Sequence, residues 1–102
     1  MGNSYSCLWE FRVAAESVES FERHYGPHGT WAALFRRSPG YIETLLLSDR
    51  AAPGRYLTID RWQDEEAYSG FRRQFGADYA ALDSECEALT IEETFIGAFR
   101  ES

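Results

Sequence analysis

The amino-acid sequence predicts a single α+β domain in which two helical regions cover one face of a four-stranded antiparallel sheet. Apolar side chains alternate with polar ones in four short segments, and they recur at helical spacing in two longer segments. These segments follow the order strand, helix, strand, strand, helix, strand. A chain of 102 residues has room for one hydrophobic core, so residues 1–102 are expected to form one domain.

The first strand is expected at Tyr5–Val13, where polar and apolar residues alternate. A helix follows, with Ser17 as its N-cap. Gly26-Pro27 should break this helix, because proline lacks the backbone N–H that a helix interior needs. A second helical piece around Trp31 should then end at Ser38-Pro39-Gly40.

Two further strands are expected at Tyr41–Leu47 and Arg55–Trp62, joined by a loop of turn-forming residues. Asp64 is placed to cap one long helix with a narrow apolar stripe, and Gly76 to kink it. The last strand is expected at Thr90–Phe99.

This order is the split βαβ arrangement of ferredoxin-like domains, which leaves one face of the sheet free of helices. That face is not polar in this sequence, because the strands carry large apolar residues on both faces. Trp9 falls on one face and Leu8 on the other; Phe95 and Phe99 fall on one face and Ile96 on the other. An exposed apolar sheet face normally marks an interface, and a closed two-fold dimer is the commonest way to cover it. We therefore expect a homodimer whose sheets pack face to face.

The charge balance excludes several function classes. Ten basic residues stand against seventeen acidic ones, which gives a net charge of −7. Nucleic acid would meet a repulsive field, so it is not an expected partner. All ten basic residues are arginines. Without lysine the chain has no Schiff-base nucleophile, no pyridoxal attachment point and no P-loop lysine.

The expected location is the cytoplasm. Cys7 and Cys86 lie far apart without a metal-binding spacing, so both are expected to be reduced and buried. No secretory leader is evident, and no stretch approaches the roughly 18 apolar residues that a membrane span needs. Met1, Gly2 and Ser6 match a myristoylation pattern, which we interpret as a chance match because the same segment opens the first strand.

One stretch of the chain carries a family resemblance. Tyr56–Trp62, followed by Asp64–Tyr68 and Phe71, resembles the antibiotic biosynthesis monooxygenase domains of the dimeric α+β barrel superfamily. Members typically end the third strand with an acidic residue two positions before a tryptophan and then open a helix with a short polar run. The resemblance covers nearly the whole chain and implies a dimeric barrel. It is less specific for activity, since members include quinol and polyketide oxygenases, haem-degrading enzymes and proteins with no demonstrated chemistry.

The resemblance suggests roles for individual residues. Trp62 falls where members place a pocket tryptophan, and Tyr68 where the aromatic polyketide oxygenases place a tyrosine. The asparagine of those oxygenases would fall at Thr58, and their arginine has no clear counterpart. Arg72 occupies the position at which haem-degrading members carry a histidine, so haem degradation is disfavoured.

The chemistry that the resemblance implies needs no metal, flavin or other cofactor. A deprotonated phenol or enol can itself donate an electron to oxygen, so the site must hold an aromatic molecule, take one proton and exclude water. Asp60 lies on the same side of its strand as Trp62 and Thr58. Burial there would raise its pKa and make it a candidate base. The alternative is that Asp60 pairs with Arg61 or Arg55, or is solvated near the strand end.

A high aromatic content, 16% of all residues, supports a pocket for a flat aromatic ligand. Each aromatic side chain has core packing as its alternative role, and the arginine could belong to the solvated side of its helix. The candidates to contact the ligand, beside Trp62 and Tyr68, are Trp9, Trp31, Thr58, Phe71, Arg72 and Phe75.

His24 and His28 are spaced four apart, as two metal ligands on one helix would be. The intervening Gly26-Pro27 spoils that geometry, so we expect no metal site. Either histidine remains a candidate base at the pocket mouth, because its pKa lies near physiological pH.

These observations favour a monooxygenase without cofactor that acts on an aromatic, quinol or polyketide-like molecule. Two alternatives remain open: a small-molecule-binding or stress-response barrel without chemistry, and a polyketide isomerase or cyclase that uses one acid–base group and no oxygen. The expected partners are a small aromatic ligand and a second copy of the chain, with no membrane.

Overall fold

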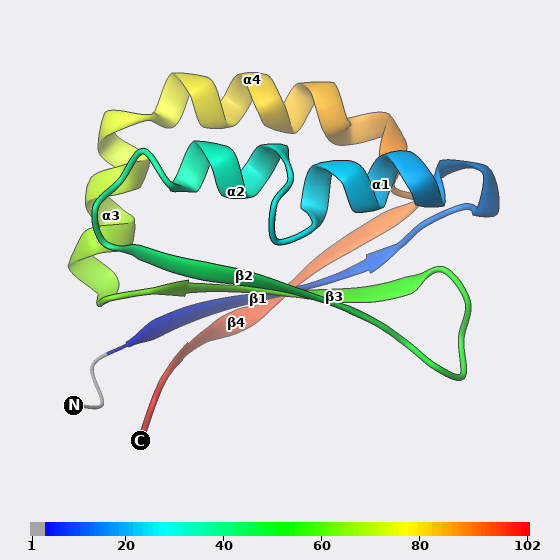
Figure 1. Ribbon diagram of the computed structural model, residues 1–102, viewed down its shortest axis with the longest axis horizontal. Coiled ribbons are helices and arrows are strands. Elements are labelled where there is room, and N and C mark those ends of the chain that lie inside the picture. The colour runs from blue at the N-terminus through cyan, green and yellow to red at the C-terminus, as the bar shows by residue number, and fades with distance from the viewer. Residues whose placement is uncertain (1–3) are drawn as a thin grey trace.

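The computed structural model describes residues 4–102, so Met1 and Gly2 of the myristoylation pattern lie outside the described residues. Four strands form one antiparallel sheet in the order β2-β3-β1-β4 (Figure 1). Their bounds are β1, Tyr5–Arg12; β2, Tyr41–Ser48; β3, Arg55–Trp62; and β4, Glu92–Arg100.

The helices lie together on one face of this sheet (Figure 1). The predicted ferredoxin-like α+β fold is therefore confirmed. The α-helices are α1, Val18–Tyr25; α2, Thr30–Phe35; α3, Glu65–Gln74; and α4, Gly76–Cys86; the two 3-10 turns are η1, Ala15–Ser17, and η2, Glu87–Leu89. Among these residues, no helix is long and apolar enough to cross a membrane.

The helix boundaries follow the sequence signals in two places and depart from them in two. The break at Gly26-Pro27 is confirmed. So is the cap at Asp64, whose Oδ1 accepts a hydrogen bond from the Ala67 N–H at 2.8 Å. Ser17 makes no side-chain cap, because η1 runs directly into α1 and leaves Ser17 in a helical conformation. The expected long helix is two helices, since the backbone turns at Phe75.

Both edge strands carry a bulge. In β2 the pairing with β3 shifts between Tyr41 and Glu43. In β4 the pairing with β1 shifts so that Trp9 faces Phe95 while Leu8 faces Gly97. The extra residue in a bulge reverses the alternation of faces. Tyr41 and Thr44 therefore share the helix-covered face.

The β4 bulge corrects one expectation about the sheet faces. Phe95 lies on the helix-covered face, where its ring centroid is 5.0 Å from that of Trp9. Phe99 pairs with Ser6 and so lies on the opposite face. The two phenylalanines, expected on one side, are thus on different sides. Gly97 has a φ of 154°, a backbone conformation that favours glycine, and this allows the bulge to form beside it.

The core between the sheet and the helices is built mainly from aromatic rings. Tightly packed rings of this kind stabilise the fold through apolar burial and edge-to-face contacts. Cys7 and Cys86 are free and buried, as expected. The largest completely buried side chains are Trp62, Phe21 and Phe71.

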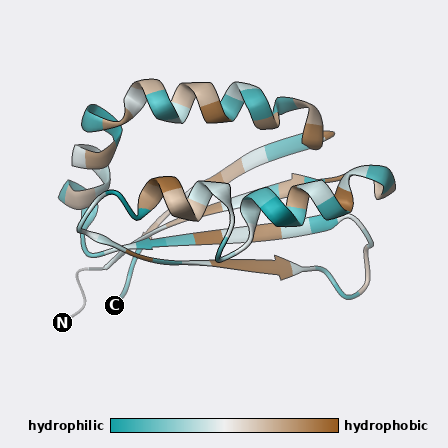
Figure 2. Ribbon diagram, turned by 45° about the horizontal axis from the view of Figure 1, so that its top comes forward, coloured by the Kyte–Doolittle hydropathy of each residue, from teal (hydrophilic) through white to brown (hydrophobic). Residues whose placement is uncertain are grey.

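The sheet face without helices carries exposed apolar side chains, as predicted, beside the charged residues Glu10, Glu43, Arg55 and Arg61. Leu45 and Leu47 of β2 and Phe99 of β4 are each at least 39% exposed. Register places Leu57 and Ile59 of β3 beside the two leucines. The leucines at the end of β2 appear as a hydrophobic segment in Figure 2. We call these five residues the outer apolar face.

Candidate active site

A cavity opens between the helix-covered face of the sheet and the helices α1, α2 and α4. Its enclosed volume is about 50 Å³, or about 450 Å³ when the space open to solvent is included. Aromatic rings form most of its wall and carboxyl and hydroxyl groups the rest. The strands contribute Trp9, Phe11, Thr44, Thr58, Asp60 and Glu93, and the helices contribute Tyr25, Trp31, Phe35, Tyr79 and Asp83.

Asp60 stands among the strand residues of this cavity. It lies between Thr58 and Trp62 on the inner side of β3, and Thr44 of β2 lies opposite it. Thr44 is 3% exposed, and its Oγ1 donates a hydrogen bond to Asp60 Oδ1 at 2.8 Å. Burial raises the pKa of Asp60 to about 6, while the bond from Thr44 opposes that rise. Asp60 is thus partly buried, and the direction of its pKa shift is the one that the sequence reasoning attached to burial at this position.

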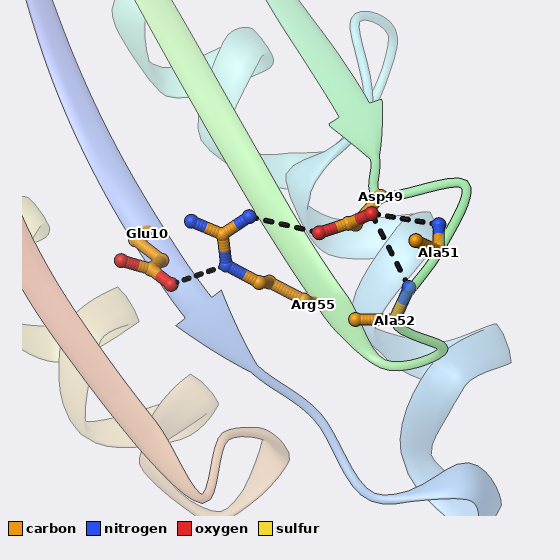
Figure 3. Close-up of polar contacts among 5 residues, drawn as sticks. All are labelled: Glu10, Asp49, Ala51, Ala52 and Arg55. Atoms are coloured by element: carbon orange, nitrogen blue, oxygen red, sulfur yellow. Dashed lines mark hydrogen bonds and ion pairs between the residues drawn. The ribbon is translucent and has the colours of Figure 1, made fainter.

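The alternative ionic partners of Asp60 are engaged elsewhere. Arg61 donates to Glu43 at 2.6 Å on the outer side of the sheet. Arg55 bridges Glu10, at 2.6 Å, and Asp49, at 2.8 Å, and thereby ties the β2–β3 loop to β1 (Figure 3). Within residues 4–102, Asp60 has no salt bridge. A carboxyl that is partly buried without a cation, as this one is, suits proton transfer near neutral pH.

Trp62 lies behind the cavity wall and does not line it. Its side chain is completely buried among the rings of Phe35, Tyr41, Tyr68 and Phe71, with centroids 5.2–5.5 Å away. Within the described chain, its Nε1 has no hydrogen-bond partner. The contact with Phe35, which does line the cavity, links Trp62 to the site indirectly.

The other aromatic candidates divide between wall and core. Trp9 and Trp31 line the cavity, as expected for ligand contacts. Phe71 and Phe75 do not, because α3 directs them into the core cluster and its margin. Trp31 is 7% exposed and its Nε1 has no hydrogen-bond partner among residues 4–102. A ligand oxygen that reached this N–H would satisfy a buried donor.

Tyr68 and Arg72 form a second layer outside the cavity. Arg72 Nη1 donates to the Tyr68 hydroxyl at 2.9 Å. The Arg72 guanidinium carbon lies 3.9 Å from the ring centroid of Tyr79, a cavity residue. Cation–π attraction at this distance holds the Tyr79 ring in place. The structure thus gives Arg72 a contact with a wall residue and none with the cavity itself.

The two histidines lie away from the cavity. His24 Nδ1 shares a hydrogen bond with Thr30 Oγ1 at 2.9 Å, and His28 is exposed in the break between α1 and α2. In the part of the chain described, no cluster of three or more His, Cys, Asp or Glu side chains is placed to hold a metal ion.

Several cavity residues were missed by the sequence reasoning. The missed rings are Phe11, from a strand, and Tyr25, Phe35 and Tyr79, from helices; their periodic spacing indicates core without distinguishing a cavity wall. Thr44 could have been noticed as a polar residue just before three leucines. Asp83 and Glu93 come from α4 and β4, and only the tertiary fold brings them to the same cavity.

The charged side chains that line the cavity are all acidic. Its lining contains three carboxyl groups, from Asp60, Asp83 and Glu93, and, among residues 4–102, no arginine or histidine. Burial raises the pKa of Glu93, and the neighbouring Asp83 and Glu87 add to that rise. A carboxylate-bearing ligand would be repelled here, whereas a neutral or cationic one would not.

Comparisons with known proteins agree with this fold. Two crystal structures of SnoaB, a cofactor-independent oxygenase from Streptomyces nogalater, are 26% and 27% identical to the chain, with TM-scores of 0.70 and 0.66. Each match covers 95% of this chain and 91% of SnoaB. The protein PA3566 from Pseudomonas aeruginosa shares the fold at 18% identity, with a TM-score of 0.65 over 98% of this chain and 93% of that one.

No curated protein matches the chain significantly. The family model for antibiotic biosynthesis monooxygenase matches residues 4–74, well over half of the chain. This match contains β1, β2, β3 and α3, and thus Asp60, Thr44 and the segment around Trp62. The chain belongs to the antibiotic biosynthesis monooxygenase family.

Proposed function

We propose that the protein is a cofactor-independent monooxygenase that oxidises a flat, electron-rich phenol or enol, with Asp60 as the base. The observation that carries this proposal is a carboxyl group with a pKa of about 6, without a cationic partner in the described chain, in a cavity with aromatic walls. The likeness to SnoaB supports the reaction type.

The proposed reaction requires one proton-accepting group from the protein and a cavity that holds the substrate. Asp60 takes a proton from the bound substrate, and the resulting anion donates one electron to O₂. The two radicals combine to a peroxide anion, which takes the proton back from Asp60 to give a hydroperoxide, and the hydroperoxide loses water to leave a carbonyl. In sum, a CH₂ group of the keto form and one O₂ give a C=O group and one H₂O. The cavity contributes by orienting the substrate, by holding the proton and by excluding bulk water.

The lining residues suggest the charge of the substrate. Three carboxyl groups disfavour an acid, and aromatic walls favour stacking of flat rings. The Thr58 side chain belongs to the cavity lining, which supports a hydrogen bond from its hydroxyl to a substrate oxygen. We therefore propose a neutral polycyclic phenol or enol as the substrate class.

The test measures oxygen uptake with 9-hydroxyanthracene, the enol of anthrone. We expect one O₂ consumed for each anthraquinone formed, at a rate well above that without protein and unchanged after dialysis against EDTA. Anthracene-9-carboxylic acid should bind about tenfold or more weakly than the phenol, because its carboxylate adds a negative charge near the three carboxyl groups of the cavity. Loss of activity on chelation would contradict the cofactor-independent mechanism and restore His24 and His28 as candidate ligands.

One observation favours a second candidate function. Thr58 stands where the polyketide oxygenases of the family carry an asparagine, so part of their machinery is absent. A protein that binds the aromatic, or that isomerises or cyclises it through Asp60, would need no such residue. Tight binding of 9-hydroxyanthracene with no oxygen uptake above the background would establish this alternative.

We propose further that two copies of the chain associate through the outer apolar face. An apolar sheet face of this kind is normally covered, and a two-fold dimer would bury it. Replacing Ile59 by Glu at the middle of that face is expected to yield a monomer in native mass spectrometry, where the wild type gives a dimer. Glu19→Gln, an exposed change on α1, is the matched control. A wild-type monomer would contradict the proposal.

A further inference from the structure

Asp60 is the end of a short chain of hydroxyl groups. Thr44 Oγ1 donates to Asp60 Oδ1 at 2.8 Å, and the Tyr41 hydroxyl lies 2.7 Å from the same Thr44 oxygen. Thr44 is buried, and Tyr41 is half-buried with its ring against Phe35 and Trp62. The β2 bulge between Tyr41 and Glu43 creates this alignment, because regular alternation would put Tyr41 and Thr44 on opposite faces.

The direction of the chain follows from proton counting. An ionised carboxylate can only accept, so the single hydroxyl proton of Thr44 points to Asp60. The Thr44 oxygen must then accept from its other neighbour, so the Tyr41 hydroxyl is the donor of the second bond. Both bonds therefore run toward Asp60, and successive bonds of this kind polarise one another.

We propose that Thr44 and Tyr41 are positioning residues for Asp60: their hydrogen-bond chain holds Oδ1 in place and leaves Oδ2 as the oxygen that takes the substrate proton. This inference rests on the proposed function. A proton on Oδ2 leaves Oδ1 as a carbonyl oxygen, which still accepts from Thr44. The chain is thus the same before and after proton transfer, and the site need not rearrange during the reaction.

The effect of this hydrogen-bond chain on Asp60 can be measured separately from the effects of the neighbouring titratable groups. The titratable side chains that interact with Asp60 come from β1, β2, α3 and α4. They are Cys7, Tyr41, Tyr68 and Tyr79. The pKa of each is raised, to about 12 for Cys7 and Tyr79, so all four are neutral while Asp60 titrates. The charged residues beyond them are Arg72, which contacts Tyr68 and Tyr79, and the acidic residues Asp83 and Glu93 of the same cavity. The hydrogen bond from Thr44 is what lowers the pKa of Asp60 against the effect of burial.

The experiment titrates the Asp60 carboxyl by ¹³C NMR in the ligand-free protein, with Asp60→Asn to assign the signal. Thr44→Val removes the hydroxyl at nearly constant volume and is expected to raise the pKa of Asp60 by about one unit or more. Thr44→Ser keeps the hydroxyl and should restore the wild-type value. Tyr41→Phe, which keeps the packed ring, should give a smaller rise in the same direction.

A second readout connects the chain to activity. The acid limb of the pH profile of kcat/KM for oxygen uptake should move upward in Thr44→Val by the amount seen in the NMR titration, and return in Thr44→Ser. An unchanged Asp60 pKa in both Thr44→Val and Tyr41→Phe would overturn the inference, as would an acid limb that stays in place. If the wild type consumed no oxygen, the proposed function would fail, and with it the catalytic part of this inference. The NMR titration would still decide whether the hydrogen bonds from Tyr41 and Thr44 act on Asp60.

Discussion

Replacing Asp60 by asparagine is expected to lower kcat for oxygen uptake by roughly 10²–10⁴-fold, the usual contribution of a positioned general base. The amide has nearly the same shape and can still accept from Thr44, so binding of 9-hydroxyanthracene should change little. Stopped-flow absorbance and an oxygen electrode would measure the two effects separately. A variant that keeps its rate would show that another group takes the proton.

The same substitution is expected to make the protein more stable at neutral pH. The pKa of Asp60 is about 6 in the folded protein and 3.8 ordinarily, so the folded state holds this proton more tightly than the unfolded state does. Wild-type stability therefore falls as the pH rises from about 4 to about 6, by about 3 kcal/mol in all.

Urea unfolding at two pH values checks this linkage. Because asparagine does not ionise, Asp60→Asn should be more stable than the wild type by about 3 kcal/mol at pH 7, with the difference closing near pH 4. An equal difference at both pH values would mean that ionisation of Asp60 is not its cause. A gain in stability with a loss of activity is typical of a functional site that conflicts with folding.

Replacing Trp62 by alanine is expected to destabilise the fold by about 3–5 kcal/mol, because it removes a completely buried ring that contacts four others. Trp62→Phe should recover part of that loss, since a smaller ring still fills much of the space. Thermal unfolding would measure both. The contrasting variant is Trp9→Ala, which alters a half-buried cavity residue and should weaken aromatic binding more than it lowers Tm.

A Trp62→Ala protein with wild-type Tm and impaired binding would contradict this assignment. It would show that the indole contacts the ligand directly, as the family resemblance suggests for a pocket tryptophan. Trp62→Phe, which keeps a packed ring but lacks the indole N–H, would then bind the ligand as weakly as Trp62→Ala.

The parts of the fold that were predicted correctly are those with local causes. Gly26-Pro27 breaks a helix wherever it occurs, and Asp64 caps one through a bond to a backbone N–H three residues away. That Asp60 shares one side of its strand with Thr58 and Trp62 followed from alternation along an unbroken strand, whereas which side faces the helices did not. These signals act over a few residues, so they can be identified without the rest of the chain.

The parts that were not predicted depend on tertiary packing. The bulges next to Tyr41 and Phe95 shift the pattern by one residue, and in β2 nothing in the local composition marks the shift. Trp31 and Trp62 both sit in apolar patterns, yet one lines the cavity and the other fills the core. That difference arises from how α2 and α3 pack on the sheet, which short-range periodicity does not determine.

The same bulges bear on how the protein avoids aggregation. β2 and β4 are the two edges of an open sheet, and a regular edge can add strands from other chains without limit. The shifts at Ile42 and Ile96 interrupt the even spacing of N–H and C=O groups along both edges. Strands of another molecule therefore cannot continue the sheet in register over its full length. Bulged edges of this kind disfavour the edge-to-edge pairing by which a sheet grows into a fibril.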